Sequence, residues 1–147
     1  MAEDTGTFQP LGESDRRMHG RTALLVCGFG ADEQRALLDL LTGCDLGSLP
    51  VVFVMDDHRE TALHELARLP DRTGIGSAST LRRALVLSGL TEGELHAVMD
   101  VYRKSQLPRS LWAAVTPVSE KWTIGELLNE LHQEREALRQ AREAQGN

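Results

Sequence analysis

Residues 21–41, RTALLVCGFGADEQRALLDLL, and residues 82–102, RRALVLSGLTEGELHAVMDVY, are two versions of one pattern. The likeness continues without a gap at a constant offset of 61, so that residues 21–66 align with residues 82–127. Eleven of the 46 aligned positions are identical, and the apolar positions stay in phase throughout. The pattern predicts one supersecondary unit that is present twice.

Each copy reads as strand, helix, strand, helix. The apolar runs Ala23–Cys27 and Ala84–Ser88 both end at a glycine, which is typical of a buried strand entering a turn. We expect the second strands at Val51–Met55 and Leu111–Thr116. This alternation predicts an α/β fold, in which two tandem β-α-β-α repeats form one small, mostly parallel sheet with helices on both faces and a long C-terminal helix.

The same reading divides the chain into segments of one compact domain. We expect residues 1–20 to form a disordered N-terminal arm and residues 21–69 the first repeat. Residues 70–82 are expected to form a linker, because their glycine and serine content marks a loop. Residues 83–147 then form the second repeat with its extended C-terminal helix.

The glycine turns after the two first strands are candidate ligand sites. If a two-fold axis runs along the strands, the strand order is 2-1-1′-2′ and the two turns meet at the topological switch point. Helix N-termini at such turns attract anions. Neither turn carries a complete G-x-G-x-x-G or a P-loop lysine, and a glycine after a strand also suits a tight turn. The candidate residues for binding a nucleotide or another anion are Gly28, Gly30, Gly89 and Thr91.

Composition excludes several classes of function. The chain has 147 residues, 41% hydrophobic and 26% charged, which suits a soluble globular domain. A net charge of -6, with the basic residues interleaved among acidic ones, argues against nucleic-acid binding. No apolar run approaches the roughly 18 residues of a membrane span, and the N-terminus has no apolar core of a signal peptide. We therefore expect a cytoplasmic protein, with Cys27 and Cys44 as small buried thiols rather than a redox pair or metal ligands.

Residues 51–60, VVFVMDDHRE, look like the first strand and acidic pair of a response-regulator receiver domain. The repeat argues against this interpretation, because the tempting phosphoacceptor Asp100 aligns with Asp39 inside a predicted helix. Carboxylates and imidazole also suit divalent metals. The spacing matches no closed zinc pattern, and a charged loop is usually a solvated turn. We expect no metal and no cofactor, with Asp56, Asp57 and His58 kept as weak metal candidates.

Residues 112–134 contain both tryptophans of a chain with 4% aromatic residues. The pair Thr116–Pro117 ends a strand abruptly, because proline cannot continue the ladder. Trp122 precedes the helix cap at Thr123, where it can pack as a hydrophobic staple or serve as a binding anchor. The last helix becomes polar beyond Leu131, as a solvated tail or as an arm that contacts a partner. The candidate partner-binding residues are Thr116, Pro117, Trp122 and Leu138.

The second half also carries a family resemblance. Its motifs are Ser88–Gly89–Leu90, Ala114–Val115–Thr116–Pro117, Trp122–Thr123 and the Leu127-Leu128-x-Glu130-Leu131 run with the acidic helix that follows. Residues 83–136, which hold these motifs, resemble an uncharacterised family of small bacterial and plastid-type domains of unknown function. The first half looks like a diverged copy. The resemblance implies a fold but no activity.

Two functional hypotheses follow. In the first, the protein is a non-enzymatic interaction or regulatory module that binds a protein partner or forms a homodimer. It would present the loop of residues 116–122 and the final helix. In the second, it is a small-ligand binding protein or an enzyme that uses the glycine turns.

Overall fold

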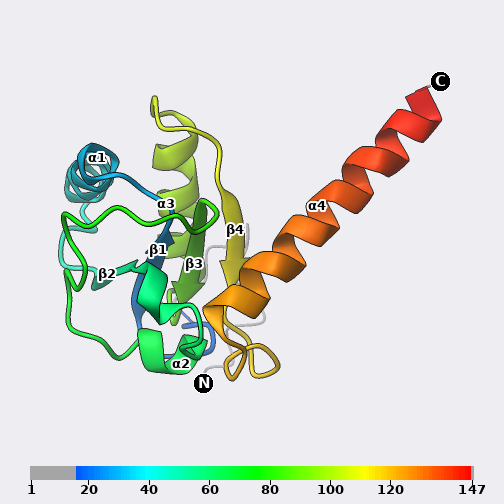
Figure 1. Cartoon of the computed structure of the whole chain (residues 1–147). Coiled ribbons are helices and arrows are strands. Elements are labelled where there is room, and N and C mark those ends of the chain that lie inside the picture. Colours follow the sequence, from blue (N-terminus) through cyan, green and yellow to red (C-terminus); the bar gives the residue numbers. More distant parts are fainter. Residues whose placement is uncertain (1–15, 147) are drawn as a thin grey trace, which may run out of the picture.

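The computed structural model describes residues 16–146 of the 147-residue chain. These residues form a four-stranded sheet with helices on both faces, and a long helix leaves the body of the molecule (Figure 1). The predicted α/β class is confirmed. The strands are β1 (Ala23–Cys27), β2 (Val51–Val54), β3 (Ala84–Ser88) and β4 (Leu111–Ala114). The helices are α1 (Ala31–Gly43), η3 (Asp56–His58), α2 (Leu63–Leu66), α3 (Glu92–Arg103) and α4 (Ile124–Gly146).

The strand order is β2-β1-β3-β4, which is the predicted order 2-1-1′-2′. Strand β1 pairs parallel with β2, and β3 pairs parallel with β4. The two registers correspond at the offset of 61, because Leu24 lies opposite Val51 and Leu85 lies opposite Trp112. The sheet therefore consists of two matching parallel pairs.

The pairs join through an antiparallel contact, which corrects one expectation from the sequence. In the β1–β3 ladder Leu25 lies opposite Val86, and an isolated antiparallel bridge joins Ala62 to Thr123. These two pairs each join residues 61 apart, so a two-fold axis that relates the predicted repeats runs perpendicular to the sheet and not along the strands. The turns at Gly28 and Gly89 consequently lie at opposite ends of the sheet, and the prediction that they meet at a switch point is wrong.

The perpendicular axis keeps equivalent helices on the same face. Helices α1 and α3 cover one face, and α2 and the start of α4 cover the other. All residues of β1, β2 and β3 are buried, because both faces of the sheet are covered, and this explains their unbroken apolar runs. The core on the α1–α3 face includes Leu24, Val26, Leu37, Leu41, Phe53, Leu85, Leu87, Val98 and Tyr102. The core on the α2–α4 face includes Leu25, Val52, Val54, Leu63, Leu66, Val86, Ile124, Leu127 and Leu128.

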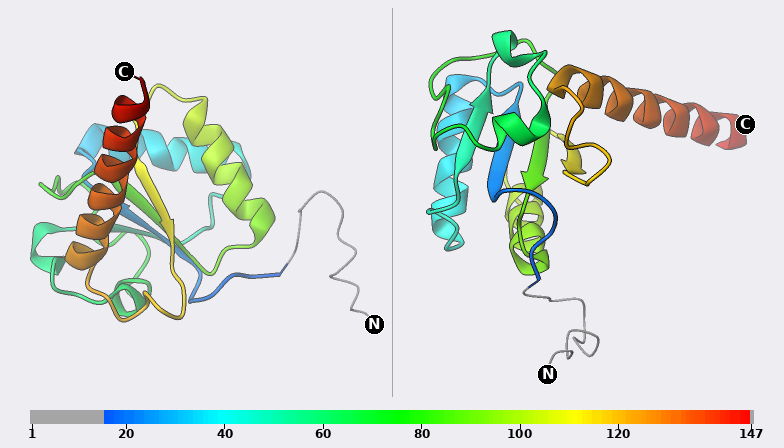
Figure 2. Two further views of the ribbon diagram at one scale, coloured as in Figure 1. Left: turned by 90° about the vertical axis from the view of Figure 1, so that its right-hand side faces the viewer. Right: turned by 90° about the horizontal axis from the view of Figure 1, so that it is seen from below.

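Helix α4 is much longer than its counterpart α2. It begins with the predicted capping box, in which Thr123 Oγ1 accepts from Glu126 N at 3.1 Å and Glu126 Oε1 accepts from Thr123 N at 2.9 Å. Its 23 residues span about 35 Å, and its distal part leaves the body (Figures 1 and 2). Its buried residues all belong to the first turns, and Leu138 is 62% exposed. Across residues 16–146, no helix combines the length and the apolar character that crossing a membrane requires.

Part of the predicted N-terminal arm falls within the described residues. His19 O accepts from Gly89 N at 3.0 Å, and Met18 N donates to Leu90 O at 2.8 Å. Residues 16–20 are thus held against the turn that leads into α3. Residues 1–15 lie outside the described part of the chain.

Candidate functional site

The two edge strands of the sheet differ. On the β2 side, the chain returns after α2 and runs along the outer side of the strand. Arg72 N donates to Val51 O at 2.7 Å, and Phe53 N donates to Thr73 O at 2.8 Å. Val51 N donates to Asp71 Oδ1 at 2.8 Å. We call residues 71–74 the edge strap, because residues 71–73 bond three of the outward polar groups of β2, which are Val51 N, Val51 O and Phe53 N.

On the β4 side the corresponding groups have no such partner. Leu111 N donates to Arg83 O at 3.2 Å and Val115 N to Leu87 O at 2.9 Å, so these residues face β3. Because hydrogen bonding alternates along a parallel strand, the N–H and C=O groups of Trp112 and Ala114 face outward. Among residues 16–146 no backbone or side-chain group bonds to them. All four residues of β4 are partly exposed.

One pair of equivalent positions accounts for part of the difference between the edges. Helix α2 ends at Leu66, Pro70 opposes any further helix, and the strap begins at the next residue. Its equivalent at the offset of 61 is Leu131, a good helix former, and α4 continues through it. The segment that would have covered β4 is helix instead. An unpaired edge of this kind can accept a further strand.

A pocket of about 520 Å³ lies at this open edge. Its lining comes from α3, the α3–β4 loop, β4 and α4. Because α3 packs on one face of the sheet and α4 on the other, a pocket lined by both lies beyond β4. Figure 2 (left) shows β4 between these two helices. The lining residues are Met99, Tyr102, Arg103, Leu107, Arg109, Ser110, Trp112 and Arg135.

Aromatic side chains make the inner wall of the pocket. Tyr102 and Trp112 meet edge to face, with ring centroids 5.4 Å apart and an interplanar angle of 89°. The Tyr102 hydroxyl donates to Pro108 O at 2.6 Å and so fixes the loop that leads into β4. Burial raises the pKa of the Tyr102 hydroxyl above its ordinary value. This wall is therefore preformed.

Three arginines, Arg103, Arg109 and Arg135, rim the pocket, and its lining contains no aspartate or glutamate. Other arginines are paired, for example Arg17 with Glu94 at 3.0 Å. Within residues 16–146, no carboxylate lies within ion-pair distance of the three rim arginines. A cationic site with an aromatic wall in a chain of net charge -6 is a candidate binding site.

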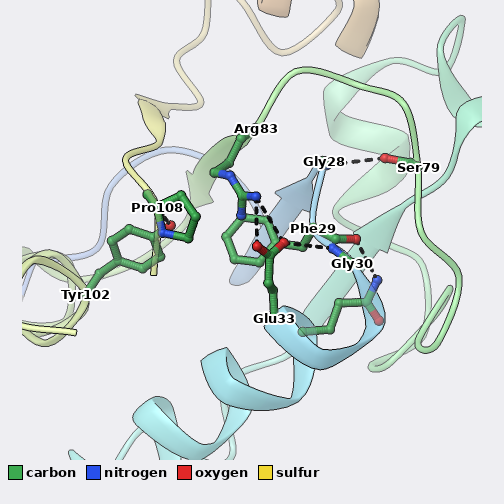
Figure 3. A network of polar contacts seen from close by, with 9 residues as sticks. Gly28, Phe29, Gly30, Glu33, Ser79, Arg83, Tyr102 and Pro108 are labelled. Atoms are coloured by element: carbon green, nitrogen blue, oxygen red, sulfur yellow. Dashed lines mark hydrogen bonds and ion pairs between the residues drawn. The ribbon is translucent and has the colours of Figure 1, made fainter. Parts of the chain in front are cut away.

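The first pair of predicted ligand-binding residues, Gly28 and Gly30, lies at the start of α1 (Figure 3). Gly28 N donates to Ser79 Oγ at 3.2 Å, and Gly30 N donates to Glu33 Oε1 at 2.9 Å. Both carboxylate oxygens of Glu33 accept from Arg83 Nη2 at 3.0 Å. The Gly30 amide is the main cause that lowers the pKa of Glu33, and Arg83 adds to it. The chain's own side chains thus occupy the amides that an anion would use.

Arg83 joins the two halves of the chain at this turn. Its guanidinium lies over the Phe29 ring, 4.6 Å from the centroid. Its Nη1 is buried and has no hydrogen-bond partner among the described residues. A cation stacked on the ring and bound to Glu33 stabilises the junction of α1 with β3.

Gly89 and Thr91 show the equivalent arrangement at the other end of the sheet. Thr91 Oγ1 accepts from Glu94 N at 3.0 Å and Glu94 Oε1 accepts from Thr91 N at 2.9 Å, which confirms the predicted capping box. Gly89 has φ 65°, and the backbone of residues 20–22 crosses its face. Gly28 has φ 77° and is crossed in the same way by residues 81–83. Both glycines therefore have a structural reason to be glycine.

The predicted partner-binding residues are not brought together. Thr116 and Ser119 close a tight turn, in which Ser119 N donates to Thr116 Oγ1 at 3.1 Å, and Pro117 lies within it. Trp122 packs partly buried on the α2–α4 core and borders a second, acidic pocket. Leu138 lies on the distal part of α4, about 20 Å of helix beyond the first turn.

The weak metal candidates organise a loop. Asp56 Oδ1 accepts from Thr80 N at 2.8 Å and from Thr80 Oγ1 at 3.1 Å, which ties η3 to the linker. His58 Nδ1 accepts from Met55 N at 3.0 Å. Asp57 lies between them in η3. Over the described range, no group of three or more histidine, cysteine, aspartate or glutamate side chains is arranged to hold a metal ion.

Sequence reasoning did not single out the rim arginines or Trp112 as a site. They are spread over 33 positions, lie on three elements and one loop and form no motif, so only the fold brings them together. One signal was available, which is the contrast between Pro70 and Leu131 at equivalent positions.

Comparison with known proteins supports the resemblance of the second half. A family model described as a domain of unknown function (DUF3783) matches residues 83–138, which include β3, α3, β4 and the first part of α4. The candidate pocket lies inside the matched region. No match was found among curated proteins or among solved structures. The origin of the first half as a diverged copy stays a prediction.

Proposed function

We propose that the protein is a non-enzymatic, cytosolic interaction module that binds an extended segment of a partner protein along β4. The observation that carries the proposal is the contrast between the two sheet edges. The edge strap bonds Val51 N, Val51 O and Phe53 N, whereas the outward groups of Trp112 and Ala114 have no partner among the described residues.

The physical basis is strand addition. An edge strand offers a row of main-chain donors and acceptors, and an extended peptide can pair with them while its alternate side chains enter flanking pockets. Proteins usually cover or disrupt such edges, as the strap does at β2. Here α3 and α4 flank β4 on opposite sides (Figure 2), and no described segment bonds to the outward groups of the strand. The pocket beside Trp112 supplies side-chain recognition that a four-residue strand alone provides only weakly.

The test is peptide selection against an edge-blocked variant. The substitution Ala114→Pro removes one outward N–H without touching an inward bond, whereas Ala114→Ser keeps the amide and serves as the matched control. Peptides from an unbiased display library should enrich on the native chain and on Ala114→Ser, and should not bind Ala114→Pro. Hydrogen exchange should slow at the amides of Trp112 and Ala114 on binding. Peptides that bind the three proteins equally would refute strand addition, provided that circular dichroism shows Ala114→Pro to be folded.

Sedimentation of the purified chain tests a second copy as the occupant. If the native chain is a dimer and Ala114→Pro is a monomer, the strand added to β4 comes from a second copy of the chain and not from a partner protein. The competing hypothesis, a nucleotide or other anion bound at the glycine turns, has less support. Those turns lie at opposite ends of the sheet, and Glu33 and Glu94 occupy the cap amides of Gly30 and Thr91.

A further inference from the structure

We infer that the segment added to β4 is acidic, with carboxylate side chains bound by Arg103, Arg109 and Arg135. This inference rests on the proposed function and specifies the partner of the same site. It begins from the charges around the pocket, where three guanidinium groups rim one volume of about 520 Å³.

The rim arginines are not neutralised by the acidic residues near them. Asp100 is one turn before the end of α3, and its Oδ2 pairs with Lys104 Nζ at 3.1 Å. Glu136 follows Arg135 in sequence but pairs with Arg139 at 2.9 Å. That pair is the main cause that lowers the pKa of the Glu136 carboxyl, and the charge of Arg135 contributes less. Both carboxylates thus have other partners. The positive charge of the pocket remains available to a ligand.

Three arginine side chains that line one pocket favour an anionic ligand there. Arginine binds carboxylates through two parallel hydrogen bonds, and such charge-assisted bonds are stronger than neutral ones. The net charge of -6 disfavours acidic ligands over most of the surface, so attraction is local to the pocket and acts within the screening length of about 8–10 Å. Binding at this site should therefore weaken as salt is raised.

Strand geometry predicts which positions of the ligand are acidic. Side chains of an added strand alternate between the two faces of the sheet. Those that point to the α3 side meet Arg103 and Arg109 together with the apolar side chains of Met99, Leu107 and Trp112. Arg135 approaches from α4 on the opposite side. An extended segment that carries acidic residues on both of its faces, with apolar residues beside them on the α3 side, fits this arrangement.

The experiment uses defined peptides and the full chain. The probe is a terminally blocked eight-residue peptide that repeats Val-Glu-Glu-Val twice, so that Glu points to both faces, and carries a neutral fluorophore. The controls replace Glu by Gln or by Lys. Binding is followed by fluorescence anisotropy. The variants are Arg103→Gln, Arg109→Gln and Arg135→Gln. The matched control is Arg142→Gln, because Arg142 is exposed on α4 outside the pocket.

The Glu peptide should bind the native chain, and each rim substitution should weaken it about tenfold. Arg142→Gln should leave the affinity unchanged, the Gln peptide should bind at least about tenfold more weakly, and the Lys peptide should not bind. Since the rim arginines are exposed and unpaired within the described chain, these variants should keep the native melting temperature.

The outcomes separate the two proposals. If the Glu and Gln peptides bind equally and Ala114→Pro abolishes both, acidic recognition is wrong and strand addition stands. If the rim substitutions abolish binding of the Glu peptide but Ala114→Pro does not affect it, acidic recognition stands and strand addition is wrong. If inorganic phosphate binds with the same dependence on the arginines and no peptide binds, the inference of an acidic segment is overturned in favour of a small anion.

Discussion

At Gly28 and Gly89 the backbone of the other half of the chain crosses close to the glycine, and a substitution can measure the energetic effect of this close approach. In Gly89→Ala, the new Cβ would collide with Gly20 O and lie 2.7 Å from Thr22 N, both backbone atoms. The left-handed φ of 65° adds a cost of about 1–2 kcal/mol for a residue with a side chain. Forcing the crossing backbone apart adds about 1–3 kcal/mol, by analogy with overpacked cores. We expect the free energy of unfolding to fall by about 3 kcal/mol.

The matched control is Gly76→Ala, because Gly76 has φ 88° but a Cβ there would meet no atom within 4 Å. It should lose only the conformational cost, about 1 kcal/mol, part of which the stiffer unfolded chain offsets. Urea denaturation with a shared m-value measures both variants. The difference between them isolates the close approach at Gly89. Equal losses in the two variants would refute the reasoning, since φ alone would then explain the effect.

Three further outcomes follow from the structure. Glu33 has a lowered pKa in the folded chain, so its contribution to stability is complete above the ordinary value of 4.5 and is lost as the pH falls through the lower folded value. The loss of unfolding free energy in Glu33→Gln, measured by urea titration, should therefore be largest near neutral pH and vanish in acid. Burial raises the pKa of Cys27 to about 12, so a thiol reagent should modify Cys44 in the folded protein and reach Cys27 only on unfolding. Truncation after Arg139 should change the free energy of unfolding by less than about 0.5 kcal/mol and leave peptide binding intact. Truncation after Glu134 also removes the rim arginine Arg135, so it should weaken peptide binding about tenfold with the same small effect on stability.

Much of the fold was predictable because the pattern is local. Buried strands such as Ala23–Cys27 are continuous apolar runs, and the capping boxes at Thr91 and Thr123 mark helix starts in a few residues. The strand order followed from the predicted repeat. The direction of the second unit did not, because a two-fold axis along the strands and one perpendicular to the sheet give the same order. The antiparallel pairing of Leu25 with Val86 depends on contacts that no single segment encodes.

The candidate site was less predictable for the same reason. The sequence suggested Gly28 and Gly89 as ligand-binding turns. Both positions require glycine because another backbone segment crosses them closely, which only the tertiary structure reveals. Arg103 and Arg135 are ordinary surface arginines of two helices in sequence, and they meet because those helices flank one edge strand. A motif search cannot find such a site, although comparison of equivalent positions in the two halves shows where their structures diverge.

The edge strap has a consequence for stoichiometry. A sheet with two open edges can grow at both ends, and each added chain presents a new edge, so that assembly continues into a fibre. Here Val51 N, Val51 O and Phe53 N are bonded within the chain, which opposes growth at that end. Under the proposed strand addition, one chain would accept one strand, and two copies that paired through β4 would close the assembly at a dimer. Because the strap covers the β2 edge, the sheet has a single edge, β4, at which a strand could be added.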